Sequence, residues 1–142
     1  MKAFVVSVLT VSLYLITALV TGLHNFYWLM DMVNGASLNA LNLTALIGSL
    51  TLVVAAVLKA YGSRVAVKIG VVGSLLLWVY YGPLIFVGLS MPSTALSQIR
   101  EFISDQNYVP LFGILLGPIL LIACTVTLTL SFRLHREVRQ TV

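Results

Sequence analysis

Residues 69–89 read IGVVGSLLLWVYYGPLIFVGL, a run that contains no charged side chain. An α-helix rises about 1.5 Å per residue, so about 20 apolar residues cross the ~30 Å hydrocarbon core of a bilayer. A spanning segment must also satisfy its backbone hydrogen bonds internally, and an α-helix does so. We therefore expect this run to cross a membrane as a helix.

Three further apolar runs of similar length flank it, at residues 3–23, 41–59 and 109–132. The composition agrees, because 60% of the 142 residues are hydrophobic and only 8% are charged, against about 25% charged in soluble domains. Lipid-facing side chains need not be polar. The sequence predicts an all-α integral membrane protein, a four-transmembrane-helix bundle with a single membrane domain over residues 1–142.

The basic residues indicate the orientation of the bundle. Cytoplasmic loops carry an excess of Lys and Arg, and the connection between the third and fourth runs holds only Arg100. We expect both termini to be cytoplasmic (N-in, C-in), most simply in a bacterial cytoplasmic (inner) membrane. The net charge of +4 then reflects orientation and not nucleic-acid binding. The residues on the expected inner side are Lys59, Arg64 and Lys68 after the second run and Arg133, Arg136 and Arg139 after the fourth.

The first run has a competing interpretation as a cleaved signal peptide. Lys2 precedes an apolar stretch, and small residues occur at positions 18–22. However, the stretch exceeds a typical signal core of about 7–15 residues and shows no clean Ala-x-Ala site. We expect residues 3–23 to be a retained membrane span.

Small residues four positions apart predict close helix packing. Residues i and i+4 share one face of a helix, and small side chains let membrane helices approach closely. The pattern alone leaves open whether the contacts lie within one chain or between copies. The pairs are Ala45 and Ser49 in the second run, Gly70 and Ser74 in the third, and Gly113 and Gly117 in the fourth.

Two Gly-Pro dipeptides, Gly82-Pro83 and Gly117-Pro118, predict helix breaks. Proline removes a backbone donor and kinks a helix. On antiparallel neighbours both breaks would fall in the same outer half of the membrane. Paired breaks can mark a transporter site, yet Gly and Pro are also frequent in membrane helices, and we favour packing.

The outer connection between the third and fourth runs is expected to hold an amphipathic helix over residues 93–105. Apolar residues recur there at helical spacing, from Leu96 to Ile103, as in helices that lie on a membrane surface. A partner on the outer side would meet this segment and the end of the first run. The candidate outer-face contacts are His24, Trp28, Asp31, Ile99 and Phe102.

Several membrane chemistries lack their usual residues in this sequence. The central parts of the expected spans hold neither charges nor His, which argues against proton coupling and b-type haem. Cys124 is the only cysteine, and no hydrolase or phosphate-loop motif occurs. An outer grouping of His24 with Asp31, Glu101 and Asp105 is the only acid–base set. We expect no catalytic residue, no cofactor and no metal site.

These observations favour a non-catalytic small integral membrane subunit or scaffold. It would pack against a larger membrane-protein partner or against itself, within the lipid bilayer. The alternative is a small oligomeric transporter or channel for a neutral or lipid-like substrate along the two Gly-Pro helices. A membrane enzyme ranks third.

Overall fold

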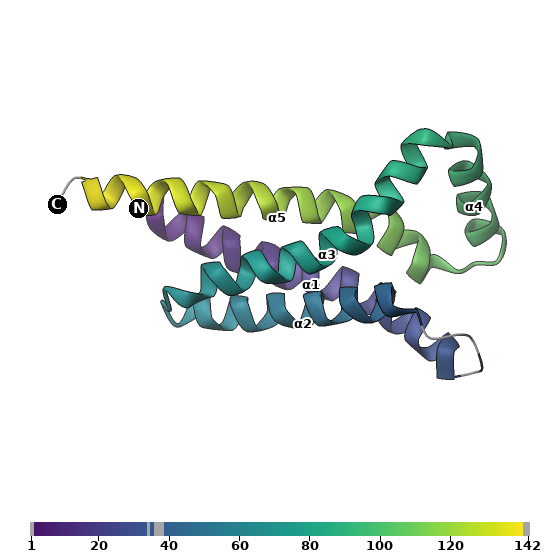
Figure 1. Cartoon of the computed structure of the whole chain (residues 1–142), viewed down its shortest axis with the longest axis horizontal. Coiled ribbons are helices and arrows are strands. Elements are labelled where there is room, and N and C mark those ends of the chain that lie inside the picture. The colour runs from purple at the N-terminus through teal and green to yellow at the C-terminus, as the bar shows by residue number, and fades with distance from the viewer. Residues whose placement is uncertain (1, 34, 36–38, 141–142) are drawn as a thin grey trace.

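The computed structural model describes residues 2–33, 35 and 39–140, and the side chains of residues 4–30, 35 and 39–133. The described chain is all-helical (Figure 1). Four of its helices contain segments long and apolar enough to cross a membrane, which confirms the expected count of spans. The helices are α1 (Lys2–Val33), α2 (Ala40–Ala60), α3 (Val65–Ser90), α4 (Pro92–Ser104) and α5 (Tyr108–Gln140).

The long helices run side by side, and each packs against two others. Helix α1 packs on α2 and α5, and α3 packs on the same two helices. Figure 1 shows the N-terminal end of α1, the C-terminal end of α5 and the turn between α2 and α3 at one end of the bundle, with α4 at the other. We call these the terminal end and the α4 end.

Local backbone chemistry explains where two of the helices begin and end. Helix α2 stops at a turn in which Gly62 has φ +75°, a conformation that glycine adopts without strain. The backbone N–H of Gly62 donates to the Lys59 carbonyl at 3.0 Å, and that of Ser63 donates to the Leu58 carbonyl at 2.9 Å. Helix α4 begins with Pro92 in its first turn, where a missing N–H costs nothing.

Helix α1 extends well beyond the apolar run that predicted it. Residues 24–33 add His24 and a group of aromatic and apolar side chains, and none of them is a helix breaker. The candidate membrane span within α1 accordingly covers Phe4–Met30. His24 thus lies within the continuous helix α1 and not in a loop that follows it.

Helix α3 bends away from the bundle in its second half (Figure 1). Pro83 lies inside this helix, and Pro118 lies inside α5, so the expected breaks are prolines within continuous helices. After the bend, α4 folds back to contact α3 and α5. No residue of α4 is buried.

Candidate functional site

Six polar side chains of α1 form one continuous buried face, which we call the polar seam. Their exposed fractions are all 0–1%. From Thr10 to His24 the spacing alternates between four and three residues, and Asn25 follows Thr21 by four, so all six lie on the side of α1 that faces the other helices. Lipid cannot hydrogen-bond to such groups, and their burial removes them from it. The polar seam consists of Thr10, Tyr14, Thr17, Thr21, His24 and Asn25.

Several side chains of the polar seam donate hydrogen bonds to backbone carbonyls of their own helix. The Thr10 hydroxyl donates to the Val6 carbonyl, and the Thr21 hydroxyl donates to the Thr17 carbonyl, both at 2.7 Å. The Asn25 amide donates to the Thr21 carbonyl at 2.7 Å. This return bond to the preceding turn allows Thr and Asn to remain helical in an apolar environment.

Other polar groups connect one helix to the next. The hydroxyls of Thr21 in α1 and Ser49 in α2 are 2.7 Å apart. On the opposite side of the bundle, the Trp78 indole of α3 donates to the Thr125 hydroxyl of α5 at 3.0 Å. Each such bond contributes about 0.6 kcal/mol between membrane helices. Together they fix the register in which the helices pack.

His24 lies in an aromatic cluster at the α4 end of the seam. Its Nε2 is 3.1 Å from the Tyr80 hydroxyl of α3. The ring centroids of Tyr80, Tyr81 and Trp28 lie 5.9, 6.3 and 6.4 Å from that of His24. Aromatic pairs at these separations attract one another through offset and edge contacts. The histidine is therefore part of the interior of the bundle.

Glycines on the facing helices make room for the large seam rings. A Cβ at Gly70 of α3 would overlap the Tyr14 ring, and a Cβ at Gly113 of α5 would overlap the His24 ring. A Cβ at Gly117 would lie 2.7 Å from atoms of the Tyr81 ring. Because a real Cβ does not approach other atoms so closely, only glycine fits at these three positions beside the neighbouring rings.

The small-residue pairs singled out from the sequence are thus used inside this chain. Gly70, Gly113 and Gly117 accept rings from neighbouring helices. The other three side chains, Ala45, Ser49 and Ser74, are 0–4% exposed. Tyr81 directly precedes Gly82 and contacts Gly117, so the two Gly-Pro dipeptides lie at one level. None of the six small residues presents a free face to a second copy.

The candidate outer-face residues are dispersed. His24 was expected at the surface but is 1% exposed, because α1 continues as a helix past residue 23 and keeps the seam on its inner face. Trp28 is half-buried beside it, and Ile99 and Phe102 are half-buried on α4. The side chain of Asp31 lies outside the described residues. His24 therefore lies in the interior of the bundle and cannot take part in the expected acid–base grouping on the outer surface.

The seam offers neutral hydrogen-bonding groups. Among the described residues, no group of three or more His, Cys, Asp or Glu side chains could hold a metal ion. Four buried atoms have no protein hydrogen-bond partner among those residues: Tyr14 Oη, His24 Nδ1, Asn25 Oδ1 and Tyr81 Oη. Hydroxyl, amide and imidazole groups in this setting stabilise and orient the helices.

Sequence reasoning missed the seam, although a signal was present. Thr10, Tyr14, Thr17 and Thr21 recur every three or four positions through residues 3–23, which is the period of one helix face.

Comparison of the chain with known protein families, characterised proteins and solved structures finds no match.

The fit of Tyr81 against Gly117 predicts a non-additive pair of substitutions. Gly117→Ala should cost about 1–3 kcal/mol of unfolding free energy by overpacking, and Tyr81→Ala about 3–5 kcal/mol by leaving a cavity. The double variant should lose clearly less than the sum, because the methyl occupies space that the ring has left. Unfolding in mixed micelles measures all three.

Gly88→Ala is the matched control for this cycle. Gly88 lies on the same helix as Tyr81, and a Cβ there meets nothing within 4 Å. The Gly88→Ala variant should lose no unfolding free energy, and helix propensity favours Ala over Gly by up to about 1 kcal/mol. Strictly additive losses in the Gly117 and Tyr81 variants would show that the two residues do not touch.

Proposed function

We propose that this chain is a non-catalytic integral membrane subunit or scaffold that packs against a larger membrane-protein partner or a second copy. The observation that carries the proposal is a segment that leaves the bundle with its apolar side chains uncovered. We call residues 84–104, the last part of α3 together with α4, the outer arm. Most buried polar side chains of the bundle, by contrast, form hydrogen bonds within it, and four buried atoms have no partner in the part of the chain that the structure describes.

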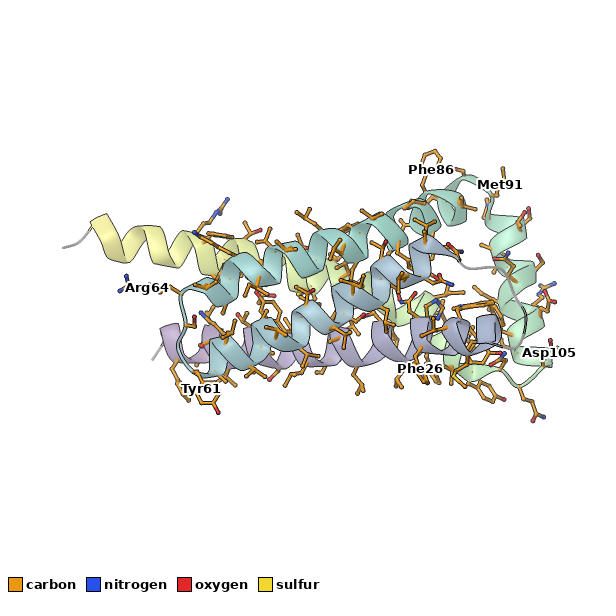
Figure 2. The ribbon with its side chains drawn as sticks, turned by 60° about the horizontal axis from the view of Figure 1, so that its bottom comes forward. Phe26, Tyr61, Arg64, Phe86, Met91 and Asp105 are labelled. Carbon is orange, nitrogen blue, oxygen red and sulfur yellow. The ribbon has the colours of Figure 1, made fainter. Side chains whose placement is uncertain are left out.

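The outer arm exposes large apolar side chains at its corner. Phe86 is 71% exposed and Leu89 is 80% exposed, and Met91 is exposed where α3 meets α4. Figure 2 shows Phe86 and Met91 on the outside of this corner. On α4, Leu96 and Ile103 are also exposed, and they lie seven residues apart on one helix face.

The length of α3 supports a position of the outer arm near the edge of the hydrocarbon core. Its 26 residues span about 39 Å, against a core of about 30 Å. The candidate span within the helix covers Val65–Ser90, so Phe86 lies in its last turns, and Met91 and α4 follow it. Large apolar surfaces outside lipid mark interaction sites. Another membrane protein's apolar surface would cover the arm.

The charges on α4 suit a protein interface. Arg100 and Glu101 are exposed on the same helix as Leu96 and Ile103. An apolar centre with a polar rim is the usual arrangement of a protein contact. An amphipathic helix resting on the membrane surface would use the same residues, and the experiment below separates the two.

Replacing the exposed apolar pair on α4 should release the partner. We expect Leu96→Ser/Ile103→Ser to lose the co-purifying protein, or the self-association, that the wild-type chain retains in mild detergent. The loss follows because buried Leu and Ile side chains each contribute about 1.5–3 kcal/mol. Cross-linking in native membranes, followed by size measurement of the purified complex, reports it.

Val72→Ser/Val79→Ser is the matched control, because this pair has the same seven-residue spacing and is also exposed, but on the bundle part of α3. The control should keep the wild-type complex. A wild-type chain that purifies as a bare monomer would contradict the proposal. It would favour the small transporter or channel for a neutral or lipid-like substrate, with the unpartnered polar atoms of the seam as its interior.

We further infer that the terminal end faces the cytoplasm, in a bacterial inner membrane. Lys59, Arg64, Lys68 and Arg133 lie at that end, whereas Arg100 is on α4 at the other. An excess of Lys and Arg in short loops supports a cytoplasmic position. The inferred direction of insertion rests on this distribution of Lys and Arg and not on the fold.

Thiol labelling of intact cells tests the inferred orientation. In a Cys124→Ser background, Asp105→Cys should react with a membrane-impermeant reagent in intact cells. Tyr61→Cys should react only after permeabilisation. Both parent residues are exposed and lie at opposite ends of the bundle (Figure 2). The reverse pattern would show that the bundle is inserted the other way round.

A further inference from the structure

A cleft of about 770 Å³ opens at the terminal end of the bundle, between α1, the turn joining α2 to α3, and α5. We call it the basic cleft. Binding pockets for small ligands have volumes of about 300–1,000 Å³. Figure 2 shows Arg64 at this end, far from the outer arm with Phe86 and Met91. The basic cleft is therefore separate from the surface proposed to bind a partner.

Half of the chain's eight Lys and Arg residues line the basic cleft: Lys59, Arg64, Lys68 and Arg133. Among the described residues, no carboxylate lines it. Asp105, one of the few acidic residues, lies at the α4 end (Figure 2). Four like charges around one hollow repel one another, and an anion between them relieves that repulsion.

Hydroxyl groups line the same hollow. Ser7, Ser63 and Ser131 contribute to the cleft from three different parts of the chain. Ser131 is 8% exposed, and its hydroxyl lies 3.4 Å from that of Thr10 at the end of the polar seam. Hydroxyls beside cations supply the donors that a phosphate oxygen accepts from. The N-terminus of α3, which begins at Val65, adds the positive end of a helix dipole.

The wall of the cleft is partly apolar, and the cleft lies at the level expected for the lipid headgroups. Val67 and Phe132 line it together with the cations. Two of the candidate spans meet at the turn between Ala60 and Val65, and charged side chains gather beside that turn, so we infer that the cleft lies at the boundary of the hydrocarbon core. A ligand held there has its charge among the cations and its apolar part toward the bilayer.

We propose that the basic cleft binds the phosphate headgroup of an anionic phospholipid. Orientation in the membrane requires basic residues at this end, but it requires neither a cleft between helices nor the serines that line it. Basic pockets between membrane helices are suited to anionic headgroups. The bound lipid seals the junction of α1, α3 and α5 at the terminal end.

Native mass spectrometry of the detergent-purified chain tests the proposal. Phosphatidylglycerol and phosphatidylcholine with the same acyl chains are added separately, and the retained lipid is counted. The wild-type chain should retain phosphatidylglycerol in preference. Each cation contributes about fivefold to such binding, so Arg64→Gln/Lys68→Gln should weaken retention about 25-fold.

Two control variants accompany the measurement. Arg64→Lys/Lys68→Arg keeps both charges and should retain phosphatidylglycerol to within a few-fold of wild type. Arg100→Gln removes a charge at the α4 end and should change nothing. Circular dichroism of each variant confirms an unchanged helix content before lipid binding is compared.

Three results would overturn the proposal. Equal retention of the two lipids would show that the cleft does not select an anionic headgroup. Wild-type retention in Arg64→Gln/Lys68→Gln would place the lipid elsewhere. Release of the lipid by millimolar inorganic phosphate, but not by chloride at equal ionic strength, would identify a site for a soluble phosphate instead.

Discussion

Polar side chains that lipid cannot solvate hold this bundle together. In water, helices associate by burying apolar surface, but lipid tails are as apolar as leucine, and that driving force disappears between membrane helices. Helix α1 has its three threonines, His24 and Asn25 on its inner face and many of its large apolar side chains outward. Once those polar groups turn inward, the facing helices must come close enough to meet them.

Close approach explains the glycines. Tyr14, His24 and Tyr81 are bulky, and each fits only because Gly70, Gly113 or Gly117 faces it without a side chain. A motif often associated with pairing of separate helices is therefore used here within one chain. The two ends of the molecule differ in chemistry: the outer arm is apolar, and the cleft is basic.

The sequence predicted the four spans because their length and lack of charge suffice for that conclusion. Helix α4, Pro92–Ser104, covers nearly the residues 93–105 that were expected to be helical, and the expectation of an amphipathic helix on the outer side stays a prediction. The role of His24 could not be predicted, since its burial depends on α1 staying helical beyond its apolar run and on Tyr80 approaching from another helix. The basic cleft likewise joins residues from distant segments.

A disulfide across α1 and α2 tests most directly that the seam faces the interior. A Cβ at Gly22 would lie 3.6 Å from that of Ser49, within the 3.5–4.5 Å range of disulfides. In a Cys124→Ser background, Gly22→Cys/Ser49→Cys should cross-link rapidly on mild oxidation. Leu23→Cys/Ser49→Cys should cross-link more slowly, because Leu23 is largely exposed at the surface of the bundle. Equal or faster cross-linking from position 23 would contradict the arrangement.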